Sequence, residues 1–61
     1  MDDLLRFFAY EHLPANLQSV SKQFHDLAHN IVDLNPADKR EATVALRKLL
    51  EAKDAAVRAF L

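Results

Sequence analysis

The stretch that decides the fold is Thr43–Phe60, with the sequence TVALRKLLEAKDAAVRAF. On a helical wheel of about 100° per residue, its apolar side chains, together with Ala42 and Leu61, cover roughly half of the circumference. The opposite strip is polar and carries Arg40, Arg47, Glu51, Asp54 and Arg58. A helix packed against one neighbour needs an apolar stripe only somewhat wider than about 100°. The surplus predicts a second partner, which we expect to be another copy of this chain.

Chain length and composition support the same expectation. The 61 residues form one small domain, 1–61, and include no cysteine. A chain of this size buries only about 60% of its unfolded surface, and neither a disulfide nor a cysteine-based zinc site can add to its stability. Self-association is the ordinary remaining route to a sufficient core.

The charge balance bears on possible partners. Eight basic and nine acidic side chains give a formal net charge of −1, whereas a protein that binds DNA or RNA usually presents a basic face. A pocket for a small anion remains open, because a pocket depends on positions and not on totals. The apolar runs are shorter than the roughly 18 residues of a membrane span, and the start MDD lacks the basic region of a signal peptide. We expect a soluble, intracellular protein.

The first two helical segments follow from apolar spacing and proline. The apolar pattern of residues 1–8 predicts a short amphipathic turn or helix. Such a segment is too short to be stable alone and must pack on another element. Pro14 suits a first helical turn and disfavours helix at Leu13, so a second helix begins there and runs to about Asp33. Its apolar residues recur at spacings of four and three, as in a coiled coil, and are Leu13, Leu17, Val20, Phe24, Leu27, Ile31 and Leu34.

The third helix is predicted from a capping pattern. Asn35 is a good N-cap, Pro36 suits the first helical position, and Asp38 resembles the acidic residue of a capping box. This helix therefore begins near Pro36 to Asp38 and runs to the end of the chain. A short connection makes the two long helices antiparallel neighbours. The predicted fold is all-α, a short N-terminal helix followed by an antiparallel two-helix hairpin that homo-oligomerises.

Histidine spacing and hydroxyl groups give little sign of metal binding or catalysis. His25 and His29 are four residues apart and can present two imidazoles to one metal, but no third ligand is placed, and a solvated polar flank is the ordinary interpretation. No spacing assembles a nucleophile, a base and an orienting group. The chain has no glycine, so it contains no phosphate-binding loop. We expect no enzyme activity, no metal and no cofactor.

One polar flank suits a nucleotide. Gln18, Lys22, His25 and His29 line an edge of the second helix, and Tyr10 lies in the connector that folds back near it. An aromatic ring can stack on a base while an ammonium meets a phosphate. The alternative is that Tyr10 caps the core and Lys22 is ordinary surface.

Lys53 falls near the middle of the apolar arc of the third helix. Its ammonium can reach an edge of the arc, pair with a carboxylate across an interface, or point into a polar pocket inside an assembly. The sequence leaves these three alternatives open.

The segments FFAYEHLPANLQSVSKQFHDLA and EATVALRKLLEAKDAAVRA resemble a family of small phage proteins. These are the anti-CBASS cyclic-oligonucleotide sponges and the related Thoeris anti-defence sponges, which share a helical hairpin domain. The resemblance implies a non-catalytic homo-oligomer, characteristically a hexamer, in the cytoplasm of the infected bacterial host. It implies capture of cyclic dinucleotides such as cGAMP between copies, which blocks activation of the immune effector. Some members also bind cyclic trinucleotides or cyclic ADP-ribose derivatives.

The resemblance also assigns ligand-binding residues. Tyr10 corresponds to the stacking aromatic, with Glu11 beside it, and Lys22 to the lysine that contacts phosphate. Thr43, Arg47 and Lys48 match the T-x-A-L-R-K-L pattern associated with a second pocket. Two positions depart from the family. Gln23 replaces a frequent proline, and Ala42 replaces a frequent basic residue, which puts affinity at the second pocket in doubt unless Lys39 or Arg40 substitutes.

A different class of function remains open. A helical hairpin with a broad apolar face can be a protein–protein interaction or regulatory module without any nucleotide ligand. A small DNA-binding module ranks third, because the balanced charge argues against it.

Overall fold

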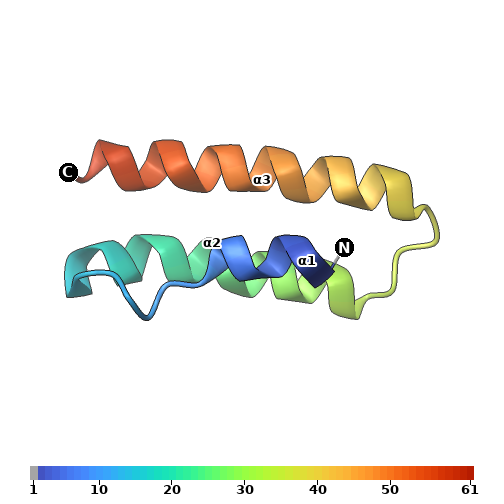
Figure 1. The fold of residues 1–61 in the computed structure, drawn as a ribbon, viewed down its shortest axis with the longest axis horizontal. Helices are drawn as coiled ribbons and strands as arrows, with labels where there is room; N and C mark the ends of the chain where they lie inside the picture. The colour runs from blue at the N-terminus through green and yellow to red at the C-terminus, as the bar shows by residue number, and fades with distance from the viewer. Residues whose placement is uncertain (1) are drawn as a thin grey trace.

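The computed structural model describes residues 2–61, and every regular element among them is helical. The chain begins with α1 (Asp2–Leu5), which continues into a short 3-10 helix, η1 (Arg6–Phe8), and is followed by α2 (Ala15–Asp33) and α3 (Lys39–Ala59). α2 and α3 lie side by side and antiparallel, and the N-terminal segment runs back along them (Figure 1). The predicted all-α fold with a long helix pair is confirmed. Met1, included in the predicted first segment, lies outside the described residues.

The junction between α2 and α3 differs from the prediction. Asn35 has a φ of 54°, and its N–H donates to the carbonyl of Val32 at 2.9 Å, so Asn35 ends α2 in the left-handed conformation that asparagine tolerates. The N-cap of α3 is Asp38, whose carboxylate accepts a hydrogen bond from the N–H of Glu41 at 3.0 Å. The predicted N-cap at Asn35 and first position at Pro36 are therefore wrong. Asp38 with Glu41 three residues later has the spacing of a capping box.

The core is built around one aromatic ring. Phe8 of η1, Ala28 of α2 and Leu46 of α3 are each fully buried and lie in one cluster. The small side chain of Ala28 leaves room for the ring of Phe8 between the helices. Partly buried apolar residues surround these three, namely Leu4, Leu5, Phe24, Ile31, Val32, Leu49 and Leu50. The N-terminal segment is therefore part of the core of the hairpin.

Lys53 fastens the N-terminal segment to α3. Its Nζ atom donates a hydrogen bond of 2.8 Å to the backbone carbonyl of Phe7, and its side chain is only 14% exposed. The carbonyls at the end of a short helix have no partner within that helix, and a lysine can supply one. Pairing across an interface and a polar pocket inside an assembly both involve other copies, so the single chain does not test these two alternatives. Within residues 2–61 the ammonium has a different partner. It pairs with a main-chain carbonyl of a distant segment, and Asp54 lies nearby at 3.7 Å.

The side of the hairpin away from Phe8 carries an apolar surface that no segment within residues 2–61 covers. We call it the outer apolar face and define it by Leu27 and Leu34 on α2 and by Ala45, Ala52 and Ala59 on α3, all of which are exposed. These residues lie roughly 100° or more around their helices from the buried core positions, and on the same side because the helices are antiparallel. Leu27 is 48% exposed and Leu34 is 81% exposed. The surplus apolar surface predicted for α3 is present and is shared with α2.

Removal of one buried hydroxyl should stabilise the fold. Ser21 is fully buried, and its Oγ atom has no hydrogen-bond partner among the described residues, a situation that costs about 1–3 kcal/mol. We expect Ser21→Ala to raise the free energy of unfolding by about 1 kcal/mol, which is roughly 4–8 °C in Tm for a domain of this size. Thermal unfolding followed by circular dichroism measures the shift. Ser19→Ala, an exposed serine on the same helix, is the control. A lower Tm for Ser21→Ala would contradict the prediction.

Candidate functional site

Three aromatic rings follow one another along one flank of α2. The ring of Tyr10 meets the ring of His25 edge to face, with centroids 5.0 Å apart and planes at 70°. The ring of His25 in turn lies 4.2 Å from that of His29, tilted by 40°. The connector between η1 and α2, residues 9–14, therefore folds back onto α2. It places the only tyrosine of the chain beside the middle of that helix.

One carboxylate contacts both Lys22 and His25 on this flank. Asp26 accepts from the Nζ atom of Lys22 with one oxygen, at 2.7 Å, and contacts Nδ1 of His25 with the other, at 3.0 Å. The bond to Asp26 raises the pKa of Lys22, and the bonds from Lys22 and then from His25 lower the pKa of Asp26. The side chains of Lys22 and Asp26 are both about half exposed. The ammonium is thus held in place but accessible to an anion.

The connector itself is held by α2. The side-chain amide of Gln18 donates to two main-chain carbonyls of the connector, that of Leu13 at 2.7 Å and that of Glu11 at 3.2 Å. The N–H of Tyr10 donates to the carboxylate of Glu11 at 3.3 Å. A hydrogen bond from its own main chain is the largest influence on Glu11 and lowers its pKa. These bonds fix the segment on which Tyr10 is carried.

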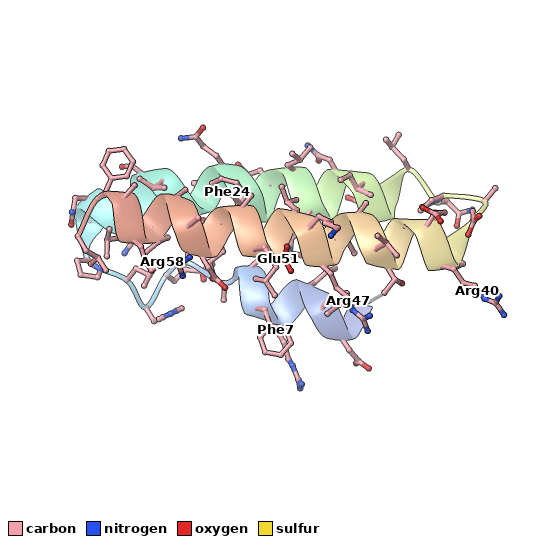
Figure 2. The ribbon with its side chains drawn as sticks, turned by 90° about the horizontal axis from the view of Figure 1, so that it is seen from above. Phe7, Phe24, Arg40, Arg47, Glu51 and Arg58 are labelled. Atoms are coloured by element: carbon pink, nitrogen blue, oxygen red, sulfur yellow. The ribbon has the colours of Figure 1, made fainter. Side chains whose placement is uncertain are left out.

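Thr43, Arg47 and Lys48, the residues assigned to a second pocket, lie elsewhere. The Oγ1 atom of Thr43 donates to the carbonyl of Lys39 at 2.9 Å, and Arg47 extends from α3 on the side of the N-terminal segment (Figure 2). Lys48 points about 100° away around the helix. Neither Arg47 nor Lys48 forms an ion pair within residues 2–61. Because α3 is antiparallel to α2, this part of α3 lies beside the second half of α2 (Figure 1).

Sequence reasoning missed the role of Asp26. The signal was present, because Asp26 follows Lys22 by four residues, the spacing at which opposite charges meet on a helix. The contact of Asp26 with His25, its immediate neighbour in sequence, depends on the rotamers of both side chains, and spacing does not predict it. The hydrogen bonds from Gln18 to the connector were also not predicted, because they too depend on the rotamer of the side chain.

Within residues 2–61, no group of three or more His, Cys, Asp or Glu side chains is arranged to hold a metal ion. None of the helices in that range has the length and apolar character needed to cross a membrane.

Comparisons with known proteins do not identify the chain. No family model, no curated protein and no solved structure gives a significant match. A functional proposal therefore depends on the residues and on the geometry described above.

The Asp26 carboxylate should make stability depend on pH in the acid range. In the folded chain its pKa lies below the ordinary value of 3.8. Its contribution to stability is therefore fully present above that pH and is lost as the pH falls through the lower pKa of the folded state. We expect Asp26→Asn to make the free energy of unfolding less dependent on pH in this range and to change it little at neutral pH, because the pair is exposed.

Urea unfolding at a series of pH values between about 5 and 2 measures this dependence. Asp33→Asn removes an exposed carboxylate from the same helix and is the matched control. An Asp26→Asn curve with the same slope as the wild-type curve would contradict the assignment.

Proposed function

We propose that this protein is a phage anti-defence protein that captures cyclic oligonucleotide messengers of bacterial immunity in pockets between copies. The observation that carries the proposal is the arrangement of Tyr10 and Lys22 on one flank of α2, connected through His25 and Asp26. The ring offers a stacking surface to a base, and the ammonium offers a charge-assisted contact to a phosphate. The resemblance to the anti-CBASS sponges assigns the same two residues to the ligand.

Binding energy favours a pocket shared by two copies. Stacking contributes about 1–3 kcal/mol per base, and a charge-assisted hydrogen bond contributes about 1.5–3 kcal/mol. One copy therefore supplies at most about 6 kcal/mol, which corresponds to a dissociation constant well above 1 μM. Two symmetry-related sets reach up to about 12 kcal/mol, near the nanomolar range. A cyclic dinucleotide such as cGAMP has the two bases and two phosphates that such a pair of sites requires.

The proposed action is capture without cleavage. A protein that only binds must match its messenger in amount, and it keeps a CBASS-type effector inactive by lowering the concentration of free messenger. The cytoplasm of the infected bacterial host is the proposed place of action, because the messengers are made there. Thr43, Arg47 and Lys48 form a proposed second site, for a cyclic trinucleotide, in which Arg47 and Lys48 supply positive charge.

The copies assemble, in this proposal, through the outer apolar face, and the resemblance favours a hexamer. Ala45, Ala52 and Ala59 recur at every seventh position, and small residues in such a row allow the helices of two copies to approach closely. Leu27 and Leu34 supply larger apolar side chains beside them.

Loss of the ring or of the ammonium should weaken ligand binding. We expect Tyr10→Ala and Lys22→Ala each to weaken the binding of a cyclic dinucleotide by at least about tenfold, because each loses a contact in both halves of a symmetric pocket. Tyr10→Phe keeps the stacking surface, so this control should bind like the wild type. Isothermal titration measures the affinities. Unchanged affinity in both alanine variants would remove this site assignment.

A charge on the outer apolar face should dissociate the assembly. We expect Ala52→Arg to lower the mass of the protein in solution, because the arginine would have to be buried without a partner. Glu51→Arg introduces the same side chain on the adjacent polar strip and should leave the mass unchanged. Light scattering coupled to size-exclusion chromatography measures both. Equal masses for wild type and Ala52→Arg would exclude this face as the interface.

The outer apolar face also favours a second candidate function. An exposed apolar surface of this kind suits a protein–protein interaction or regulatory module that has no nucleotide ligand. Ligand binding to a native protein must raise its stability. A well-folded monomer or dimer whose Tm no cyclic nucleotide raises would therefore favour this function over messenger capture.

A further inference from the structure

We propose that Asp26 is a positioning residue of the nucleotide site, an inference that rests on the proposed function. Lys22 and Tyr10 come from different segments, and the contacts between them run through Asp26 and His25. One oxygen of Asp26 accepts from Lys22 at 2.7 Å, and the other contacts Nδ1 of His25 at 3.0 Å. The ring of His25 then meets the ring of Tyr10 edge to face. A single carboxylate thus sets the relative placement of the cation and the stacking ring.

Affinity is higher when the ammonium of Lys22 and the ring of Tyr10 are already in position before the ligand binds. A free lysine side chain has many rotamers, and ordering it during binding reduces affinity. Asp26 removes part of that cost from the binding step, because it already holds the ammonium near the ring. Exposed pairs at this spacing are individually weak, so a phosphate can share the ammonium of Lys22 without first breaking a strong bond. The carboxylate therefore holds Lys22 without blocking it.

Asp26 could instead oppose ligand binding, and that role predicts the opposite change in affinity when its charge is removed. A carboxylate beside a bound phosphate repels it, and Asp26 also competes with the phosphate for Lys22. If repulsion and competition dominated, removal of the charge would tighten binding. If positioning dominates, the same substitution weakens binding although the site becomes more positive. The sign of the change in affinity separates the two roles.

The experiment compares wild type, Asp26→Asn and Asp33→Asn in isothermal titration with cGAMP and other cyclic dinucleotides. Asp26→Asn keeps the shape of the side chain and removes its charge, and Asp33→Asn removes an exposed carboxylate two turns further along the same helix. We expect the dissociation constant to rise about threefold to fivefold in Asp26→Asn, because the weak pair is lost in both halves of a symmetric pocket. We expect it to stay within twofold of wild type in Asp33→Asn.

Tyrosine emission gives a second measurement that needs no ligand. The chain has one tyrosine and no tryptophan, so intrinsic fluorescence reports the surroundings of Tyr10. We expect the emission of unliganded Asp26→Asn to shift toward that of His25→Ala, because both variants release the ring of His25 from its fixed position. Asp33→Asn should keep the wild-type emission. Circular dichroism checks that all variants remain helical.

Each outcome bears on the inference in a defined way. Weaker binding by Asp26→Asn, with altered Tyr10 emission, supports positioning. Equal or tighter binding by Asp26→Asn overturns it and leaves messenger capture intact. Wild-type emission in both Asp26→Asn and His25→Ala also overturns it. If the wild-type protein binds no cyclic dinucleotide, messenger capture and this inference both fail. The titration of the wild-type protein alone separates that outcome from a failure of the inference about Asp26.

Discussion

The burial of Phe8 between α2 and α3 is the contact on which the rest of the structure depends. Its ring lies against Ala28 and Leu46, so one side chain joins three segments of the chain. The hydrogen bond from Lys53 to the carbonyl of Phe7 fixes the same point from the main chain. Residues 2–8 cannot form a stable helix alone, so their position depends on these two contacts and on the packing of Leu4 and Leu5 against the same core. The connector that carries Tyr10 begins directly after this fixed point.

The N-terminal segment also divides the hairpin into two kinds of surface. On one side it covers Ala28 and Leu46 and completes a small core. The other side retains the outer apolar face, which α2 and α3 cannot cover by themselves. The polar flank with Tyr10 and Lys22 is distinct from both. The proposed assembly surface and the proposed ligand surface can therefore coexist in so small a chain, because they use different faces of the same helices.

The junction between α2 and α3 was only partly predictable from local sequence rules. Proline and the order of polar residues located the junction between α2 and α3 to within a few positions. They did not decide which of Asn35 and Asp38 caps α3, because both residue types suit an N-cap. Asn35 also suits a left-handed helix end, and the chain uses it there.

Local rules also predicted only part of the candidate site. Spacing placed Lys22 and His25 on one flank, but only the folded chain brings the ring of Tyr10 to His25.

The sequence by itself determined the helical class, the apolar stripes of α2 and α3 and the surplus apolar surface. These features depend on the spacing of residues within one helix, which has a fixed period of rotation. The tertiary structure decided which part of that surface Phe8 covers, that Lys53 bonds a carbonyl 46 residues away, and that the ring of Tyr10 meets the ring of His25. These contacts depend on how separate segments pack and on which rotamers then fit, and no local pattern in the sequence specifies either.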